Sequence, residues 1–323
     1  MCNKEHKEAL CVLCGNSGNT VFYRRSTNDF ILKCPQCGLL FVEPQPAKER
    51  LEEYYRTSNP DYIPGYRDQI FRRGRRILSR VNRLKPAGLL LDVGCGYGYF
   101  MDQAGKYGWK AAGVELSPAA ARFARENFGL NVFAGSLAEA GLAEKSFDLI
   151  SLQHTLEHIP EPLEMLTTLR DKLKDDGLLA IAVPNARSLM ASLAGINWVY
   201  LSERTHLFHY TNSTLRLLLE KTGFIPTSLE TCQWNTHDLL WGAKYFLKNR
   251  RTANERPETG TWDFGPETVS GREQAGRRGM AVSPGGWKSF ICRAAAPLGW
   301  LAGKMNLGAE IIALAKKDLR RGG

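Results

Sequence analysis

The segment Leu89–Phe100, with the sequence LLLDVGCGYGYF, constrains the fold of this chain more than any other. An apolar run leads into Asp92, and glycines follow at positions 94, 96 and 98 before the chain becomes aromatic. This pattern predicts a buried strand, a tight glycine loop and a helix, and the amino end of such a helix is a common site for nucleotides. The segment therefore predicts an α/β fold with a nucleotide-containing ligand.

The residues after this loop alternate between the patterns of strands and helices. Strands are expected at 89–93, 109–116, 130–135, 147–153, 177–185 and 226–233, and helices at 118–128, 162–173 and 212–224. Ser117 and Pro118 form a helix start signal, and Gly129 is the matching stop signal. Such alternation is typical of a parallel sheet with crossover helices, and a final strand is expected over residues 308–317.

The spacing of the glycines discriminates between two classes of nucleotide ligand. The dinucleotide fingerprint G-x-G-x-x-G needs its third glycine where this chain has Tyr99, so the spacing fails. The carboxylate of Asp92 would repel a pyrophosphate, but it suits the ammonium and sulfonium groups of S-adenosylmethionine. Glu115 ends the second strand, at the point where a carboxylate can accept both hydroxyls of an adenosine ribose. These residues predict S-adenosylmethionine as the ligand.

Five segments, in this order, resemble class I S-adenosylmethionine-dependent methyltransferases: LLLDVGCGYGYF, GWKAAGVELSP, FDLISLQHTLEHIPEP, LKDDGLLAIAVPN and HLFHYTNSTLRLLLEKTGF. The resemblance covers about residues 88–233 and the final strand, and it is nearest to zinc-containing sugar methyltransferases and ubiquinone-type O-methyltransferases. It implies a doubly wound, seven-stranded Rossmann-like α/β sheet whose last strand, at 308–317, is antiparallel. The expected activity is that of an S-adenosylmethionine-dependent methyltransferase.

The resemblance implies a set of cofactor-binding residues: Asp92, Gly94, Cys95, Gly96, Glu115, Leu116, Gly135, Ser136, Gln153 and His154. The glycine loop and Asp92 would hold the methionine end, Glu115 the ribose, and Leu116 would flank the adenine. Gln153 and His154 would face the methyl end. Ser136 stands where the family often has an acidic residue, and Cys95 is interpreted as a small residue that lets the loop close.

Methyl transfer to a hydroxyl needs a base that takes the acceptor proton, and histidine suits this role near neutral pH. The candidate catalytic residues are His154, His158 and His206, with no single base assigned among them, and His209 is a weaker candidate. His154 and His158 are four residues apart, a spacing that predicts one face of a helical turn. In related enzymes the pair equivalent to Glu157 and His158 lies at the mouth of the acceptor site. A structural histidine that bonds a loop is the alternative interpretation of His158.

Four of the eight cysteines, Cys11, Cys14, Cys34 and Cys37, form two C-x2-C pairs, which is zinc-ribbon spacing. A glycine follows each pair directly, at positions 15 and 38, and suits a tight turn around an ion. Two disulfides or a redox C-x-x-C are the alternatives. A closed four-cysteine site is structural, so the expected metal is a structural Zn²⁺.

The sequence divides into five expected segments. They are a zinc-ribbon-like module at 1–45, a linker and basic amphipathic helix at 46–86, the methyltransferase core at 87–233, an insertion at 234–307, and the final strand with a basic tail at 308–323. The basic helix carries seven arginines and one lysine against one aspartate between Arg67 and Lys85. A solvated basic face and a site for RNA or an acidic substrate are its two interpretations. The insertion is interpreted as a lid, an interfacial segment or packed core.

Several functions are compatible with these features. The leading hypothesis is methylation of a small molecule or glycan, at a hydroxyl of a saccharide or lipid-linked precursor. Sugar C-methylation is disfavoured because that family has a long further C-terminal domain. An RNA or ribosome-associated methyltransferase is the main alternative, but such base methylators tend to carry a motif such as N-P-P-Y where this chain has QHTLEHIP. An inactive scaffold is a third possibility, which the intact glycine loop argues against.

Composition bounds the compartment and the partners. Apolar residues make up 43% and charged residues 24% of the chain, which is typical of a folded soluble protein. No apolar segment approaches the roughly 20 residues that cross a bilayer, and no apolar signal region begins the chain. The expected location is cytoplasmic, with contact to the inner membrane surface through 238–303 as an option. The expected partner is a small-molecule or glycan substrate, with nucleic acid as the alternative.

Overall fold

The computed structural model describes residues 6–26, 29–57, 67–195, 198–202, 205–232, 303 and 305–321. The chain divides into two compact units that interleave along the sequence. The ribbon unit comprises Met1–Pro46, Pro184–Leu217 and Glu230–Ile311, and the sheet unit comprises Ala47–Val183, Leu218–Leu229 and Ile312–Gly323. Most of the expected insertion at 234–307, with the membrane-contact segment 238–303, lies outside the described residues. The five expected segments therefore remain a prediction.

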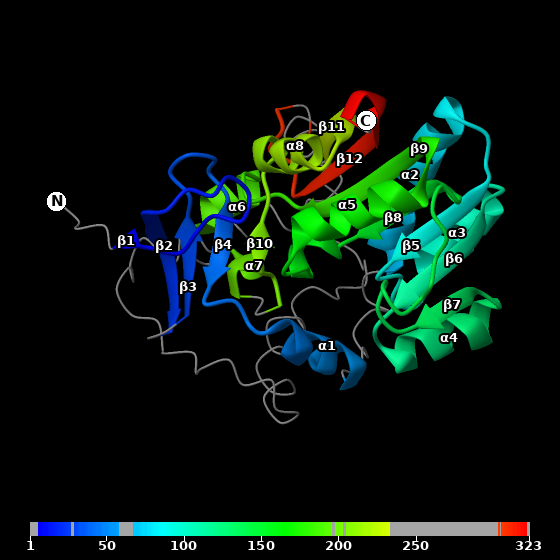
Figure 1. Ribbon diagram of the computed structural model, residues 1–323, viewed down its shortest axis with the longest axis horizontal. Coiled ribbons are helices and arrows are strands. Elements are labelled where there is room, and N and C mark those ends of the chain that lie inside the picture. Colours follow the sequence, from blue (N-terminus) through cyan, green and yellow to red (C-terminus); the bar gives the residue numbers. More distant parts are fainter. Residues whose placement is uncertain are drawn as a thin grey trace, which may run out of the picture. The chain divides into compact units, whose positions relative to one another are not determined.

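A seven-stranded sheet with the order β11-β12-β9-β8-β5-β6-β7 is the framework of the sheet unit (Figure 1). Its strands are β5 Leu89–Val93, β6 Lys110–Glu115, β7 Asn131–Ala134, β8 Phe147–Gln153, β9 Leu173–Pro184, β11 Phe224–Cys232 and β12 Glu310–Lys317. The pairs from β9 through β8, β5 and β6 to β7 are parallel, and the last strand is antiparallel. The expected doubly wound methyltransferase sheet is confirmed.

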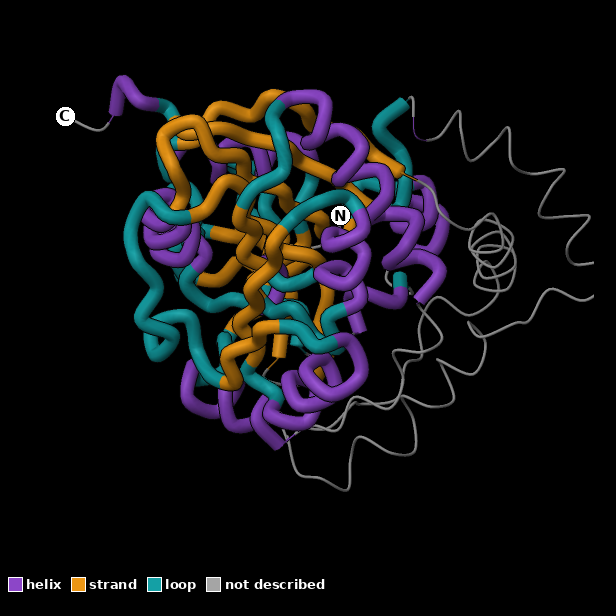
Figure 2. Tube along the Cα trace, turned by 90° about the vertical axis from the view of Figure 1, so that its right-hand side faces the viewer, coloured by secondary structure: helices purple, strands orange, loops and turns teal. Residues whose placement is uncertain are grey.

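Four helices alternate along the chain with the strands of this sheet, and the tube view draws helices in purple and strands in orange (Figure 2). They are α3 Tyr99–Lys106, α4 Pro118–Phe128, α5 Pro162–Lys172 and α8 Asn212–Lys221. Helix α4 begins as predicted, because the Ser117 side chain accepts a hydrogen bond from the Ala120 backbone N–H at 3.4 Å. Gly129 ends it in the left-handed conformation with φ 63°. The Ser117 cap lies two residues after Glu115, so the start of the helix follows closely on the end of β6.

Two further helices precede the first strand of the sheet: α1 Lys48–Thr57 and α2 Arg67–Leu84. In α2 the apolar residues Ile77, Leu78 and Val81 are buried, whereas most of the arginines lie on the outer face. The predicted amphipathic helix is therefore confirmed. One arginine departs from this pattern, because Arg73 is buried with the apolar residues.

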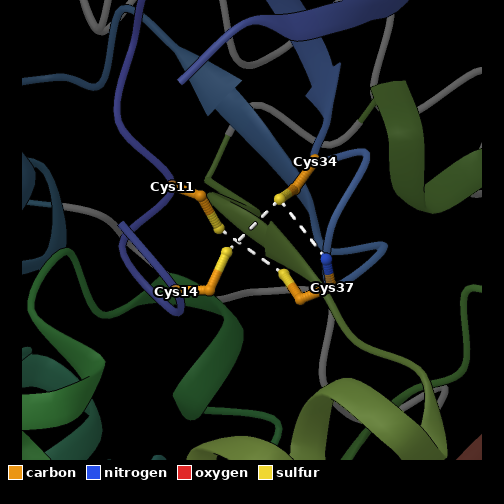
Figure 3. A group of neighbouring side chains, drawn as sticks. All are labelled: Cys11, Cys14, Cys34 and Cys37. Carbon is orange, nitrogen blue, oxygen red and sulfur yellow. Dashed lines mark hydrogen bonds between the residues drawn. The ribbon is translucent and has the colours of Figure 1, made fainter. Parts of the chain in front are cut away.

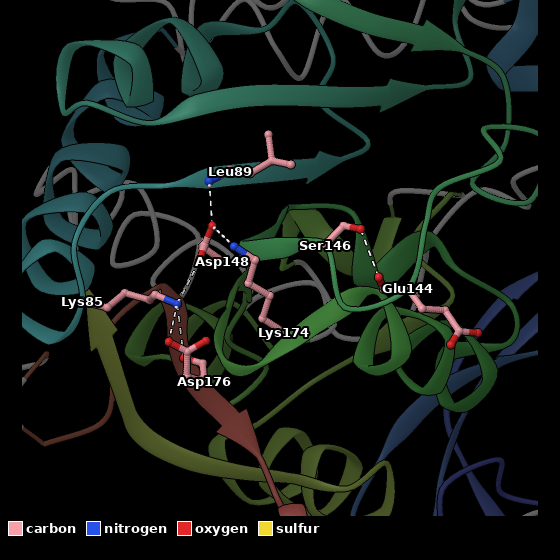
Figure 4. A network of polar contacts seen from close by, with 7 residues as sticks. All are labelled: Lys85, Leu89, Glu144, Ser146, Asp148, Lys174 and Asp176. Carbon is pink, nitrogen blue, oxygen red and sulfur yellow. Dashed lines mark hydrogen bonds and ion pairs between the residues drawn. The ribbon is translucent and has the colours of Figure 1, made fainter.

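At the amino end of the sheet, Asp148 at the start of β8 accepts hydrogen bonds from three donors (Figure 4). The Leu89 backbone N–H of β5 lies at 2.9 Å, Lys85 Nζ at 3.1 Å and Lys174 Nζ at 2.9 Å. Burial raises the pKa of this carboxyl, but the hydrogen bonds from Lys174, Leu89 and Lys85 outweigh it and hold the pKa at about 2. The network links β5, β8, β9 and the residue after α2 at the amino ends of the parallel strands.

The ribbon unit contains a five-stranded sheet with the order β1-β2-β3-β4-β10. Its strands are β1 His6–Lys7, β2 Asn19–Ser26, β3 Asp29–Lys33, β4 Leu40–Glu43 and β10 Phe208–His209. The short helices α6 Leu189–Ala194 and α7 Val199–Ser202 belong to the same unit, and the 3-10 helix η4 Leu319–Arg321 ends the described chain. Ile31 and Val42 from the strands pack with Trp198 and Leu201 in one core cluster.

Strand β10 joins this sheet from a distant part of the sequence. Phe208 pairs with Phe41 and His209 with Leu40, antiparallel, and the Val42 N–H donates to the Leu207 carbonyl at 2.9 Å. The sequence pattern predicted no strand at this point. Among the residues that the structure describes, no helix is long and apolar enough to cross a membrane.

Candidate functional site

The glycine loop after β5 adopts a conformation that only small residues tolerate. Gly94, Gly96 and Gly98 all have positive φ, at 69°, 52° and 77°. A Cβ on Gly94 would lie 2.6 Å from the Thr155 side chain, whose hydroxyl donates to the Val93 carbonyl at 3.0 Å. A Cβ on Gly96 would meet nothing within 4 Å. The loop is thus closed against the residues after β8 at Gly94 and open at Gly96.

Glu115, at the carboxyl end of β6, holds the loop through backbone hydrogen bonds. The Gly96 N–H donates to Glu115 Oε2 at 2.7 Å, and the Ser117 N–H donates to Oε1 at 2.9 Å. Burial raises the pKa of this carboxyl, although the backbone hydrogen bonds of Ser117, Gly96 and Leu116 oppose the shift. An ionised carboxylate offers about four lone-pair positions, so each oxygen can still accept a hydroxyl. This arrangement fits the two hydroxyls of a ribose.

Asp92 is the second acidic residue of the site and is 1% exposed. Burial raises the pKa of this carboxyl to about 7, opposed by a hydrogen bond from the Ser151 hydroxyl and by the positive charge of Arg73. The negative charge of Glu115 adds to the increase. A buried carboxylate that ionises near pH 7 is suited to a cationic ligand, because the ligand charge offsets the loss of solvation.

Gln153 and the residues after it line the carboxyl end of β8. Neither the amide oxygen nor the amide nitrogen of Gln153 has a hydrogen-bond partner among the described residues, although both are buried. The two carboxylate oxygens of the buried Glu157 likewise accept no hydrogen bond there, and Oε1 lies 3.3 Å from His154 Nδ1. Buried polar atoms are rarely left without partners, so this end of β8 fits a polar ligand such as the methionine group of S-adenosylmethionine.

The predicted helical face of His154 and His158 is wrong. The 3-10 helix η2 spans Leu156–His158 only, and His154 lies before it with a left-handed φ of 57°. The His154 N–H donates instead to the Ala182 carbonyl of β9 at 2.9 Å, which fixes the backbone at the strand end. The structure still brings both histidines together with Glu157 in one loop of the sheet unit.

The turn after β7 supplies an acidic group that the sequence prediction missed. The Gly135 N–H donates to the Glu115 carbonyl at 2.9 Å, which places this turn beside β6. The Ser136 N–H donates to Glu139 Oε2 at 2.6 Å, and Arg56 Nη2 of α1 lies 3.0 Å from the same oxygen. These bonds with Ser136 and Arg56 hold the pKa of Glu139 at about 2. The turn thus carries an acidic residue three positions after Ser136, and its carboxylate is bonded to Ser136 and Arg56.

Other predicted site residues have structural surroundings. The Cys95 thiol packs in a buried cluster with Met101, Ala121, Ala124 and Val132, and a Cβ on Gly113 would lie 2.6 Å from its sulfur. Cys95 thus allows close packing of the loop on β6. Leu116 is half-buried beside the strand end.

His206 and His209 lie in the ribbon unit and not in the sheet unit of His154 and His158. The His206 ring stacks on Tyr200 with 5.4 Å between centroids and 9° between planes. His209 is 2% exposed, and burial with the positive charge of Arg25 lowers the pKa of its imidazole to about 3. His209 is therefore neutral at physiological pH, as expected for a packed residue of β10.

The four cysteines of the two C-x2-C pairs converge in the ribbon unit (Figure 3). Their sulfur atoms all lie within 4.8 Å of one another, with 3.6 Å between Cys11 and Cys37 and 3.5 Å between Cys14 and Cys34. Zinc bonds of about 2.3 Å in a tetrahedron would separate the sulfurs by about 3.8 Å. A disulfide would need about 2.05 Å, and all four thiols are free.

The turns around these cysteines have matching geometry. Gly15 and Gly38 have φ of 73° and 80°, and their N–H groups donate to the carbonyls of Cys11 and Cys34 at 2.7 and 3.0 Å. The Cys37 N–H also points at the Cys34 sulfur at 3.5 Å. Burial raises the pKa of Cys11 to about 11 and also raises that of Cys37, whereas for Cys34 hydrogen bonds from the backbone and the Cys14 thiol outweigh burial and lower the pKa. The cluster fits a tetrahedral metal with thiolate ligands.

Two further residues escaped the sequence prediction. Arg73 was counted with a solvated face, yet it is buried, and its position four residues before Ile77 on the apolar face was the available signal. Tyr55 of α1 lies with Oη 2.9 Å from His158 Nδ1, a contact that the sequence pattern does not signal.

Comparisons with known proteins agree with this geometry. A methyltransferase-domain family matches residues 66–229. A ubiquinone biosynthesis O-methyltransferase from Cereibacter sphaeroides is 29% identical over 184 residues, which cover 52% of this chain and 73% of the relative. That of another strain is 30% identical over 183 residues with the same coverage.

Among solved structures, phosphoethanolamine N-methyltransferase 2 from Haemonchus contortus, in complex with S-adenosyl-L-methionine, has a TM-score of 0.52 at 17% identity. The match covers 86% of this chain and 61% of that chain, and it reflects the fold alone. The matched family range includes the glycine loop, Glu115 and the loop that carries His154 and His158.

Proposed function

The chain belongs to the methyltransferase-domain family of class I S-adenosylmethionine-dependent methyltransferases, and on that premise we propose that it methylates a hydroxyl of a lipid-linked or saccharide precursor. The observation that carries the cofactor part is the pair of acidic residues at the carboxyl ends of β5 and β6 around the open glycine loop. The name of the relatives, which refers to O-methylation in ubiquinone biosynthesis, supports a hydroxyl acceptor and favours a lipid-linked precursor.

When bound, S-adenosylmethionine supplies an electrophilic methyl group on a sulfonium centre. Asp92 and Gln153 would bind its methionine end, since one offers a buried charge and the other two buried polar atoms without partners among the described residues. Glu115 would accept the ribose hydroxyls. Leu116 and the turn at Gly135 and Ser136 would flank the adenine. The protein thereby contributes orientation of the reacting groups and exclusion of water.

The acceptor hydroxyl must lose its proton as it is methylated. His158 and His154 lie in the loop after β8, next to the residues proposed for the methionine end, and histidine is the side chain that most often acts as a general base. We take His158 as the base and keep His154, whose Nδ1 lies 3.3 Å from the carboxylate of Glu157, as the second candidate.

The ribbon unit is proposed to hold one structural Zn²⁺ through Cys11, Cys14, Cys34 and Cys37. The supporting observation is the convergence of four free thiols on two glycine turns. Metal analysis of the purified protein is expected to give about one zinc per chain, and Cys14→Ser with Cys34→Ser should remove it. A value well below one in carefully prepared protein, with no loss in the double variant, contradicts the site.

The function is tested by transfer of a labelled methyl group from S-adenosylmethionine into a fractionated cell extract. Label in the lipid fraction, released as an O-methyl group, is the expected result. Label in a saccharide also supports the proposal, because a saccharide precursor is the other proposed acceptor. Label found only in RNA would favour the nucleic-acid alternative, for which the exposed arginines of α2 would be the surface. An Asp92→Asn, Glu115→Gln double variant is the control for contaminating enzymes.

A further inference from the structure

We propose that Tyr55 of helix α1 is a positioning residue that fixes the tautomer and orientation of His158. The inference rests on the proposed function of His158 as the base, and Tyr55 itself would touch no reacting atom. Its phenol oxygen lies 2.9 Å from His158 Nδ1, and the two rings meet edge to face, with 6.0 Å between centroids and 86° between planes. The tyrosine thus contacts the imidazole both at one nitrogen and along its side.

The chemistry of a base determines which proton arrangement is useful. To take the acceptor proton, His158 must carry its hydrogen on Nδ1 and present the lone pair of Nε2 to the acceptor. The phenol oxygen of Tyr55 can accept the Nδ1–H hydrogen bond and so favours this tautomer. When the acceptor hydroxyl gives its proton to Nε2, Nδ1 keeps its own proton, and the bond to Tyr55 persists in the imidazolium.

Helix α1 is held so that Tyr55 keeps this place. Near its amino end, Lys48 Nζ lies 2.8 Å from Glu161 Oε2, in the same loop as His158. Near its carboxyl end, Arg56 Nη2 lies 3.0 Å from Glu139 Oε2, in the turn after β7. Both ion pairs are exposed and contribute little free energy individually, but Leu51 between them is 2% exposed and anchors the helix.

The consequence is that α1 crosses the carboxyl edge of the sheet between two proposed subsites. Glu139 bonds the Ser136 N–H on the adenine side, and His158 lies on the acceptor side. Tyr55 therefore holds His158 from helix α1, and the same helix also contacts the turn proposed to flank the adenine. A substitution at Tyr55 should change the base and leave the binding of S-adenosylmethionine intact.

The first test reads the imidazole directly and needs no acceptor. Long-range proton–nitrogen correlation spectra, with His158 assigned by His158→Gln, should show one dominant tautomer with the proton on Nδ1 in the full-length protein. In Tyr55→Phe, which keeps the ring, the two tautomers should mix. Tyr107→Phe at the end of α3 also removes one half-buried phenol hydroxyl and should leave the His158 signal unchanged.

An unchanged His158 signal in Tyr55→Phe, or a dominant Nε2–H tautomer in the unmodified protein, would overturn the proposal. Calorimetry with S-adenosylmethionine separates this outcome from failure of the proposed function. If the unmodified protein does not bind S-adenosylmethionine, the proposed function fails, whereas the tautomer measurement still decides the role of Tyr55. If Tyr55→Phe binds S-adenosylmethionine within about twofold of the unmodified protein, the helix remains in place.

The second test is a double-mutant cycle on the extract fraction that takes up label. Tyr55→Phe is expected to lower kcat about tenfold with KM little changed, as a misoriented base would. In the His158→Gln background the same substitution should have no further effect, because the group that Tyr55 positions is gone. Equal losses in both backgrounds would show that Tyr55 acts only by supporting the helix, and would overturn the inference.

Discussion

Two aspartates on neighbouring strands of the sheet have surroundings that shift their pKa values in opposite directions. Asp148, at the amino end of β8, has two lysines and a backbone N–H around it, and its pKa is held at about 2. Asp92, at the carboxyl end of β5, has a serine hydroxyl and a more distant arginine charge, and its pKa is raised to about 7. The fold surrounds the Asp148 carboxylate with hydrogen-bond donors and positive charge. Asp92 has too little positive charge nearby to offset its burial.

The difference separates stability from binding within one sheet. A carboxylate whose pKa is lowered on folding stabilises the folded chain, whereas a buried carboxylate whose pKa is raised destabilises it at neutral pH. A fold retains the second kind where a ligand completes its surroundings. On this basis Asp148, at the amino ends of the strands, stabilises the sheet. Asp92, at the carboxyl ends, is suited to bind a cation.

The largest expected effect is on binding at Asp92. Asp92→Asn keeps an acceptor for the Ser151 hydroxyl but removes the charge, so the affinity for S-adenosylmethionine should fall at least about 100-fold, which is about 2.7 kcal/mol. The free energy of unfolding without ligand should stay the same or rise. Calorimetry and urea denaturation measure the two quantities, and a large loss of stability with intact binding would reverse the comparison.

The next effect is on stability at Asp148. Asp148→Asn should lower the free energy of unfolding by about 2 kcal/mol, because a pKa of about 2 against an unfolded value of 3.8 corresponds to roughly that difference. The affinity for S-adenosylmethionine should change less than about twofold. Lys174→Met, at the more exposed partner of the same carboxylate, is a milder companion variant. If the free energy of binding S-adenosylmethionine falls as much as the free energy of unfolding, then Asp148 and the binding site are coupled.

The pH dependences should have opposite signs. The stabilising contribution of Asp148 is complete above about pH 4 and is lost as the pH falls toward 2. At Asp92 the folded chain holds a proton that the unfolded chain has lost, so between about pH 4 and 7 the stability falls as the pH rises.

Binding should follow the ionisation of Asp92. The affinity for S-adenosylmethionine should rise about tenfold between pH 6 and 8, because the cationic ligand prefers the ionised carboxylate. Calorimetry across this range tests the prediction, with Asp92→Asn as the control that lacks the dependence. A flat profile in the unmodified protein would mean that another group binds the cation.

The smallest expected effect is at Ser151. Its hydroxyl bonds Asp92 and opposes the rise of the pKa, so Ser151→Ala should raise the pKa of Asp92 further. The pH at which binding strengthens should therefore move upward by somewhat less than about one unit. Ser146→Ala at the amino edge, where the hydroxyl donates to the Glu144 carbonyl, is the matched control and should leave that midpoint unchanged.

Local signals predicted the framework well for physical reasons. The apolar runs of β5 and β8, the Ser117 cap and the glycine loop each leave a pattern within a few residues, so their existence and order follow from the sequence. The spacing of Cys11, Cys14, Cys34 and Cys37 is a signal of the same local kind.

The contacts that complete the site are long-range and leave no such pattern. Tyr55 contacts His158 across 103 residues of sequence and Arg56 contacts Glu139 across 83, and no local periodicity in the sequence indicates either contact. His209 was grouped with the other histidines by motif, whereas pairing of β10 with β4 assigns it to the ribbon unit. A two-residue strand is too short for a propensity signal.

That pairing also governs when the ribbon unit can finish folding during synthesis. Strand β4 ends at Glu43, and its neighbour β10 begins only at Phe208. A ribosome adding roughly 5–20 residues per second needs on the order of ten to thirty seconds to make the intervening chain. During that interval the edge of β4 that later pairs with β10 is open, and an open strand edge is the part of a sheet that pairs most readily with another chain.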